Sequence, residues 1–165
     1  MTNEFDKLFE GAGATYHIKP LLLKAIAVRE SAMNPKAYRY EPEYWEHYLK
    51  HLDSWKDKEP TIVAASYGLM QILFTTASGL GFAGTADELY DPATNIDLGG
   101  KALFEIMERL KKHDYSNFDL WFIEIALARY NGGSFRNPDM EGKLRNQVYV
   151  DRVLETYINL KRGIL

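Results

Sequence analysis

Cysteine is absent from the 165-residue chain. Disulfide bonds, thiolate nucleophiles and cysteine-based zinc sites are therefore excluded as sources of stability or chemistry. Secreted and cytosolic proteins can both lack cysteine, so this absence leaves the compartment open.

Clusters of positive charge are also absent. The net charge is −3, and the lysines and arginines form no basic run, so we expect neither a nucleic acid nor another polyanion as partner. No apolar stretch is long enough to cross a membrane.

A signal peptide is not evident in residues 1–19. Glu4, Asp6 and Glu10 interrupt this stretch, which has neither a basic start nor an unbroken apolar run. If the protein works outside the cytoplasm, we expect the sequence to be a mature form or to leave the cell by another route, such as phage-type release.

Length and composition are those of one globular unit. With 165 residues, of which 46% are hydrophobic, the chain can bury a sizeable core, and we expect a single domain over residues 1–165 that works as a monomer. Internal repeats, low-complexity stretches and convincing runs of alternating strands are lacking. The expected fold class is all-α or predominantly α.

Helices are predicted from caps and apolar periodicity. Prolines 20, 42 and 92 suit first turns, where their missing N–H is not needed. The predicted helices span residues 3–9, 20–31, 42–52, 75–79, 92–112, 119–130 and 146–161. Residues 11–13 and 132–133 are expected to end two of them. Between the helices, residues 38–65 are rich in aromatic and acidic side chains, a composition that suits either core packing or a sugar-binding wall.

Glu30 lies at the end of the apolar helix predicted over residues 20–31. Leu22, Ile26 and Glu30 are spaced four apart and share one face. A carboxyl group at the end of a buried helix face loses hydration in its charged form. Its pKa therefore rises, and it can deliver a proton near neutral pH. The alternative is a solvated glutamate at a helix end.

Two further polar pairs interrupt apolar segments: Met70-Gln71 and Tyr130-Asn131. Each has a purely structural explanation. Gln71 can be a satisfied buried amide, Tyr130 a core ring with its hydroxyl at the surface, and residues 131–133 a helix C-cap.

Taken together, these motifs resemble those of the SLT-type lytic transglycosylases in the goose-type lysozyme superfamily. The family's three motifs are matched by Glu30-Ser31, Gly68-Leu69-Met70-Gln71-Ile72 and Ala126-Leu127-Ala128-Arg129-Tyr130-Asn131-Gly132-Gly133. Residues 91–96 are similar to the start of the family's long helix, and residues 149–154 to its final helix. The resemblance extends from about Pro20 to Tyr157, and ordered sets of motifs mislead less often than single ones.

The resemblance implies a lysozyme-like α fold and cleavage of the β-1,4 bond between N-acetylmuramic acid and N-acetylglucosamine in peptidoglycan. Glu30 matches the family's single catalytic acid, which then acts as base and leaves a 1,6-anhydromuramic end. The substrate-binding positions implied are Ser31, Met70, Gln71, Tyr130, Asn131 and Tyr149. The implied partner is the glycan strand of the cell wall, in the periplasm or outside the cell, with neither cofactor nor metal.

The sequence departs from the family pattern in two places. The segment between Ser31 and Gly68 is longer by about a helix, and Arg129 stands where the family commonly has a small residue, which would narrow or charge the groove. The longer segment supplies acidic residues, of which Glu41, Glu43 and Asp53 are candidates for a second carboxylate. Such a group could hold a water molecule and produce hydrolysis with inversion, as in a goose-type muramidase.

Other interpretations stay open at this stage. Glu43, His47 and His51 are spaced four apart and could bind a metal ion, although the His-Glu-x-x-His motif is not present. A module that binds glycan without cutting it could use the same groove, but it would have little use for Glu30. A chitin-cleaving relative would recognise N-acetylglucosamine in another polymer.

Overall fold

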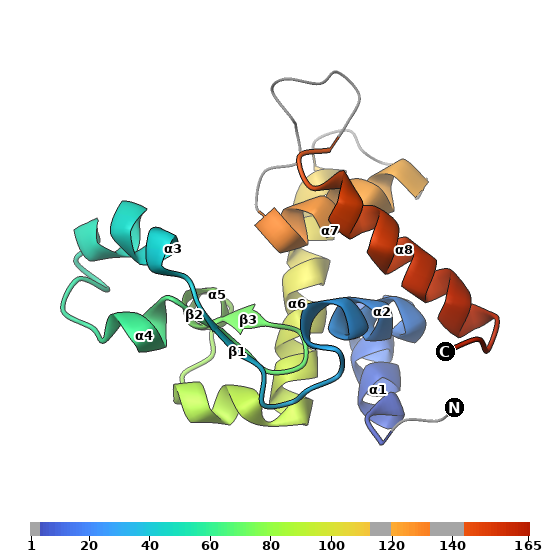
Figure 1. Ribbon diagram of the computed structural model, residues 1–165, viewed down its shortest axis with the longest axis horizontal. Helices are drawn as coiled ribbons and strands as arrows, with labels where there is room; N and C mark the ends of the chain where they lie inside the picture. The colour runs from blue at the N-terminus through green and yellow to red at the C-terminus, as the bar shows by residue number, and fades with distance from the viewer. Residues whose placement is uncertain (1–3, 113–119, 133–143) are drawn as a thin grey trace.

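The computed structural model describes residues 4–112, 120–132 and 144–165. Within these ranges it contains eight α-helices, two 3₁₀ turns and three short strands (Figure 1). In chain order they are α1 (Asp6–Tyr16), α2 (Pro20–Ser31), β1 (Tyr38–Tyr40), α3 (Pro42–His47), η1 (Leu49–His51), α4 (Pro60–Val63), β2 (Ala65–Tyr67), β3 (Ile72–Leu73), α5 (Phe74–Gly79), η2 (Ala86–Tyr90), α6 (Pro92–Lys111), α7 (Leu120–Gly132) and α8 (Gln147–Lys161). The prediction of a predominantly α class is confirmed.

The larger lobe is built around α6. Helices α1 and α7 pack against α6, while α2 packs against both α8 and α1 (Figure 1). Their apolar faces meet in one core, in which each large side chain contributes about 1.5–3 kcal/mol on burial. Fully buried members of this core include Phe9, Leu23, Ile26, Ile96, Leu103, Leu110, Ile125 and Leu127. None of the helices in the described ranges has the length and hydropathy needed to cross a bilayer.

Helix α2 places the last-turn residue Glu30 at the edge of this core. The helix begins at Pro20, as predicted, and ends because Ala32 adopts a left-handed conformation with φ 51°. The N–H of Ala32 bonds to the carbonyls of Ala27 and Val28, which closes the helix.

Helix α6 begins as its cap predicts. The side chain of Asp91 accepts a hydrogen bond from the N–H of Thr94 at 2.8 Å, and Pro92 occupies the first turn. These two residues fix the start of α6, close to the loop that carries the Gly68–Ile72 motif.

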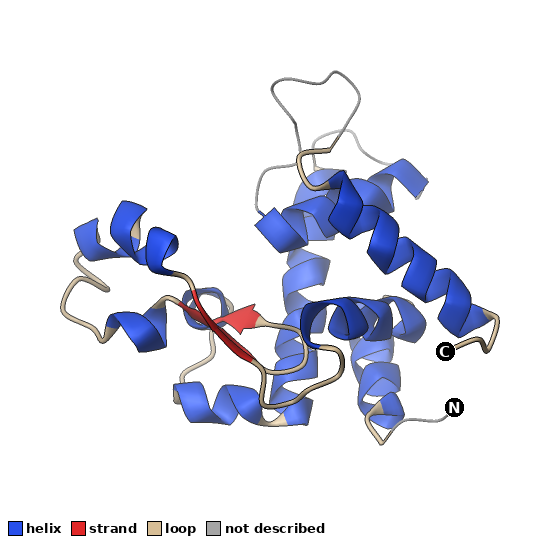
Figure 2. Cartoon of the chain, in the orientation of Figure 1, coloured by secondary structure: helices blue, strands red, loops and turns tan. Residues whose placement is uncertain are grey.

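The smaller lobe contains the sheet and helices α3 to α5. Strand β2 is central and pairs antiparallel with both neighbours, so that Ser66 lies opposite Arg39 on β1 and Leu73 on β3. Figure 2 shows the sheet between the helices of the two lobes. A second small core lies in this lobe and consists of buried Leu49, Val63 and Ala64, surrounded by Tyr40, Tyr44, Trp45, Trp55 and Phe74.

The first helix differs from the prediction. It was expected to stop at residues 11–13, but α1 continues through them to Tyr16. A Cβ atom on Gly13 would lie 2.7 Å from the Ile18 carbonyl oxygen and 2.8 Å from Pro20 Cγ. Gly13 therefore permits close packing inside the helix and does not end it.

The segment over residues 38–65 also differs from the prediction. The expected helix over 42–52 ends at His47 and is followed by the η1 turn. Leu49 is buried there, whereas Leu52 is 49% exposed. The small sheet was not predicted, because strands of two or three residues are too short to show alternation.

Asn95 fixes the Gly68–Ile72 turn. Its side chain is fully buried, and its amide nitrogen donates to the carbonyls of Tyr67 and Leu89, each at 2.8 Å. Its Oδ1 accepts from the N–H of Met70 at 2.7 Å. A Cβ on Gly68, which has φ 72°, would lie 2.5 Å from Asn95 Nδ2. Glycine is thus required where the turn approaches α6.

Substitution of Asn95 by alanine should destabilise the protein by about 3 kcal/mol, because three buried backbone groups lose their partners. Urea unfolding followed by circular dichroism would measure the change. Asn159→Ala, on the partly exposed part of α8, should change the free energy of unfolding by less than about 0.5 kcal/mol. Equal effects of the two substitutions would contradict the structural role assigned to Asn95.

Candidate active site

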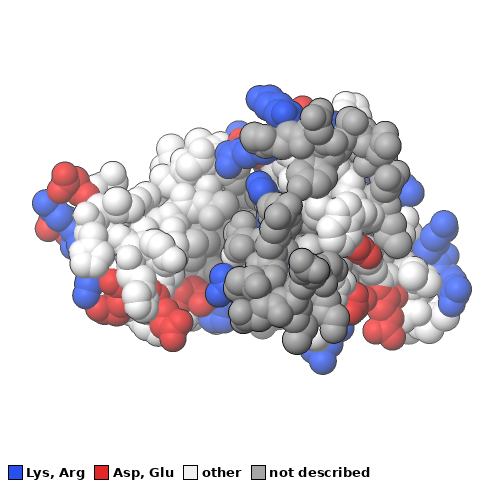
Figure 3. Space-filling model, turned by 90° about the horizontal axis from the view of Figure 1, so that it is seen from above, with Lys and Arg blue, Asp and Glu red and all other residues white. Residues whose placement is uncertain are grey.

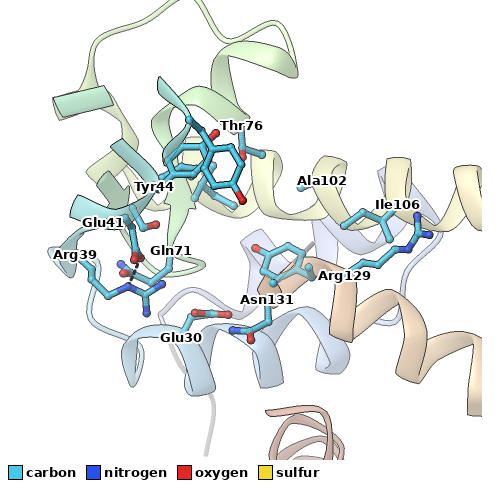
Figure 4. A pocket seen from close by; sticks show the side chains of 16 residues that line it. Glu30, Arg39, Glu41, Tyr44, Gln71, Thr76, Ala102, Ile106, Arg129 and Asn131 are labelled. Carbon is cyan, nitrogen blue, oxygen red and sulfur yellow. Dashed lines mark hydrogen bonds and ion pairs between the residues drawn. The ribbon is translucent and has the colours of Figure 1, made fainter. Parts of the chain in front are cut away.

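A groove of about 590 Å³ lies where the two lobes meet. Helices α2, α3, α5, α6 and α7 and all three strands contribute to its walls. Its lining residues are Glu30, Arg39, Glu41, Tyr44, Tyr48, Ser66, Gln71, Ile72, Leu73, Thr76, Ala102, Ile106, Arg129, Tyr130, Asn131 and Gly132. Figure 4 shows Glu30 and Asn131 on one side of this groove and Tyr44 on the other.

Glu30 is a largely buried carboxyl group with a specific partner. The hydroxyl of Tyr149, from α8, donates a hydrogen bond to Glu30 Oε1 at 2.7 Å. Burial raises the pKa of Glu30, because the charged form loses hydration. The bond from Tyr149, the nearby cations Arg39 and Arg29, and Asn131 oppose this rise only in part.

Two tyrosines are kept neutral around the acid. Burial and the nearby Glu30 carboxylate raise the pKa values of both Tyr149 and Tyr130 above the ordinary range. Each phenol therefore stays a hydrogen-bond donor at physiological pH. Tyr149 donates to Glu30, and Tyr130 donates to the carbonyl oxygen of Met70 at 3.0 Å.

Ser31 ties α2 to the turn over residues 68–72. Its Oγ lies 2.7 Å from the Leu69 carbonyl oxygen and 3.1 Å from that of Ala27. Ser31 is not among the groove-lining residues. The structure thus places it beside Glu30 as a support for the turn.

Met70 and Gln71 occupy different positions in this turn. The Met70 side chain is fully buried against Gly99, where an added Cβ would fall 2.3 Å from Met70 Sδ. Gln71 lines the groove with a left-handed backbone (φ 49°), and its Nε2 donates to the Gly68 carbonyl at 3.1 Å. The Oε1 oxygen and the second N–H of the Gln71 side chain are available to a ligand in the groove.

Asn131 lies at the end of α7 and lines the groove. Its Oδ1 accepts a hydrogen bond from Nδ2 of Asn146 at 2.9 Å, and Asn146 also donates to the Ala128 carbonyl at 2.9 Å. Because Asn146 fixes the orientation of this amide, Asn131 can offer its NH₂ group to a ligand. Gly133, the last residue of the predicted motif, lies outside the described residues, as does the predicted start of the α7 segment at Asp119.

The three candidates for a second carboxylate are separated by the fold. Glu41 lines the groove with Glu30, and its Oε1 pairs with Nε of Arg39. Glu43 is exposed on α3, away from the groove lining. Asp53 is also exposed and pairs with Lys56 at 2.7 Å. Only Glu41 is brought into the groove.

The arrangement of Glu43, His47 and His51 does not form a metal site. Nδ1 of His47 lies 2.8 Å from the backbone oxygen of Glu43, and His51 belongs to η1 and not to α3. Among the described residues, no group of three or more His, Asp or Glu side chains is placed to hold a metal ion.

Several groove residues were not predicted as parts of the site. These are Thr76 and Ile106, together with Asn146 behind Asn131. Arg39, Tyr44 and Tyr48 were not named as site residues, but they belong to the aromatic segment for which the sequence left a sugar-binding wall open. The four-residue spacing of Tyr44 and Tyr48 after Pro42 was a usable signal for a shared helix face, but the sequence did not show which face meets the groove. Arg129, which was expected to narrow or charge the groove, does line it.

Substitution of Tyr149 by phenylalanine should raise the pKa of Glu30 further. The phenol hydrogen bond stabilises the carboxylate, so its loss favours the protonated form. A pH titration of the Glu30 side-chain carboxyl by ¹³C NMR would measure the shift. Tyr157→Phe, at a partly buried position of α8, is the matched control and should leave this pKa unchanged. A Glu30 pKa that stays constant or falls in Tyr149→Phe would contradict the assigned contact.

Comparison with known proteins places this site in a family. The sequence matches the Transglycosylase SLT domain over residues 7–148, which include every residue of the groove lining. The comparison with curated proteins gave no match. The family match confirms the resemblance inferred from the motifs, and the helical architecture is consistent with the lysozyme-like fold expected from it. The chain therefore belongs to the Transglycosylase SLT domain family.

Proposed function

We propose that this protein cleaves the β-1,4 bond between N-acetylmuramic acid and N-acetylglucosamine in peptidoglycan without consuming water. Membership of the SLT domain family implies lytic transglycosylase activity on peptidoglycan. The assignment of roles to individual residues is our proposal, and it rests on the environment of Glu30 in the groove.

In the first step, Glu30 acts as general acid. Tyr149 donates to Glu30 Oε1, and we assign the transferred proton to Oε2. Glu30 transfers this proton to the bridging oxygen as the bond from that oxygen to C1 of the muramic sugar breaks. The acetamido group of the sugar can stabilise the resulting positive charge at C1 where no free second carboxylate is present.

In the second step, the same carboxylate acts as base. The C6 hydroxyl of the muramic sugar attacks C1 and forms the 1,6-anhydro ring, and its proton passes to Glu30. The acid is then regenerated. A group that first donates and then accepts a proton works best when its pKa is near the working pH, and burial moves the pKa of Glu30 upward in that direction.

The other groove residues would hold the sugars. We assign Gln71, Asn131 and the Met70 carbonyl to hydrogen bonds with the strand, with Tyr130 and Ser31 as supports for the Met70 turn. The direct contacts Tyr130–Met70 and Ser31–Leu69 support this assignment, because a precisely held backbone lowers the cost of orienting a ligand.

The observation that carries the proposal is the contrast between the two carboxyl groups of the groove lining. Glu30 is largely but not fully buried, has a raised pKa and accepts a hydrogen bond from a neutral tyrosine. Glu41 is held in an ion pair with Arg39. A paired carboxylate is a poor base for activating water, so the arrangement favours the anhydro product over hydrolysis.

Hydrolysis with inversion is the second candidate function, because Glu41 lines the same groove as Glu30. If Arg39 released Glu41 when a strand binds, Glu41 could activate a water molecule on the opposite face of the sugar. The products of the two reactions differ, so one experiment separates them. In either case we propose that the enzyme acts on the cell wall, in the periplasm or outside the cell.

The deciding measurement is mass spectrometry of the muropeptides released from purified peptidoglycan. We expect anhydromuramic ends from the wild type and a loss of about a thousandfold in rate for Glu30→Gln, because the proton donor is removed. Glu43→Gln, which changes an exposed carboxylate outside the groove, should retain the wild-type rate.

Other outcomes would contradict this proposal in distinguishable ways. Reducing muramic ends that disappear in Glu41→Gln would establish hydrolysis. The absence of products from peptidoglycan would favour a non-cutting glycan-binding module, or a chitin-cleaving relative if chitin is cut. Glu30→Gln is a fair test of chemistry, because the substitution removes a buried ionisable group and should not lower the melting temperature at neutral pH.

A further inference from the structure

Tyr48 lines the groove without serving the packing of the smaller lobe. Its side chain is 62% exposed. The rings that surround the small core of this lobe are instead Tyr40, Tyr44, Trp45, Trp55 and Phe74. The ring of Tyr48 is therefore not used up by core packing, and its apolar face is open to a ligand in the groove.

Tyr48 is nevertheless held in place. The ring centroids of Tyr44 and Tyr48 are 5.6 Å apart with an interplanar angle of 39°, and the Tyr48 N–H bonds to the Tyr44 carbonyl at 3.1 Å. Tyr44 in turn packs on the small core, and its hydroxyl lies 3.3 Å from Thr75 Oγ1. The outer ring is therefore supported by a ring that is itself anchored.

This pair belongs to the wall that faces the acid. In Figure 4, Tyr44 lies across the groove from Glu30 and Asn131. A strand in the groove would pass between the hydrogen-bonding groups of one wall and the rings of the other. The two walls offer what a sugar needs, namely polar partners for its hydroxyl and acetamido groups and a flat apolar surface for its C–H face.

The immediate neighbours of Tyr48 in the smaller lobe are other rings. Figure 3 shows charged atoms of both signs at the far end and along one edge of this lobe, and an uncharged area between that end and the centre of the molecule. The ring of Tyr48 itself contacts the rings of Tyr44 and His47. The flat C–H face of a pyranose ring fits such an aromatic surface.

We propose that Tyr48, supported by Tyr44, forms a stacking platform for one hexosamine ring of the glycan strand. The platform is a sugar subsite supplied by the enlarged segment over residues 38–65. This inference rests on the proposed function, because it takes the glycan strand as the ligand of the groove.

Glycan binding by the inactive Glu30→Gln protein tests the platform without interference from cleavage. The probe is a peptide-free octasaccharide of alternating N-acetylglucosamine and N-acetylmuramic acid, and isothermal titration calorimetry gives the Kd. Adding Tyr48→Ala should raise the Kd about tenfold, which corresponds to about 1.4 kcal/mol. Tyr48→Trp should restore binding to within about threefold, because an indole ring provides the same flat surface.

Leu52→Ala is the matched control, because Leu52 is 49% exposed in the same lobe and is not among the groove-lining residues. It should leave the Kd unchanged. In the active enzyme, with soluble glycan strands as substrate, Tyr48→Ala should raise KM while kcat stays within about twofold, because the platform contacts no reacting atom.

The outcomes distinguish this inference from the proposed function. If Glu30→Gln binds the octasaccharide and Tyr48→Ala binds it equally well, the platform is wrong and the catalytic proposal is unaffected. If Tyr48→Trp fails to restore binding that Tyr48→Ala has lost, stacking is also contradicted. If Glu30→Gln does not bind the octasaccharide, both the glycan substrate and the platform are overturned.

Discussion

The Gly68–Ile72 turn is the constraint on which the groove depends. Three side chains from three different helices bind its backbone: Ser31 from α2, Asn95 from α6 and Tyr130 from α7. The same turn joins β2 to β3, so it also sets the position of the sheet. Both walls of the groove are thereby attached to one short piece of backbone. A shift of any of the three helices relative to this turn would change the position of Glu30 relative to Gln71 and Asn131.

The burial that raises the pKa of Glu30 carries a cost in stability. Because folding raises the pKa of this carboxyl group, the folded protein holds the proton more tightly than the unfolded chain does. Ionisation of Glu30 as the pH rises through its raised pKa therefore lowers the free energy of unfolding. Tyr149 limits this loss by donating a hydrogen bond to the carboxylate. The same phenol thus restrains the pKa and holds one carboxyl oxygen.

The sequence predicted the helical class and the long elements well, because caps and periodicity are local signals. The start of α6 at Pro92 and the end of α2 after Glu30 followed from such signals. The end of α1 was predicted wrongly, because a glycine can either end a helix or allow another segment to pack closely against it. At Gly13 the second case holds, since the Ile18–Pro20 segment packs there. The motifs located Glu30 and Asn131. The ion pair of Glu41 and the support of Asn131 by Asn146 depend on tertiary contacts that no local pattern encodes.

The contacts within residues 38–65 favour a role in binding over a role in chemistry for this segment. Its carboxylates were the candidates for a second catalytic group, yet Glu43 lies outside the groove lining, Asp53 pairs with Lys56 and Glu41 pairs with Arg39. The pair of Asp53 and Lys56 lies at the surface, where it contributes little to stability. The rings of the segment, in contrast, surround the small core of Leu49, Val63 and Ala64, and Tyr44 of α3 also lines the groove. Under the proposed function, a segment with its own small core and an aromatic surface would extend the contact with the glycan strand, and the proton transfers would stay with the helix that carries Glu30.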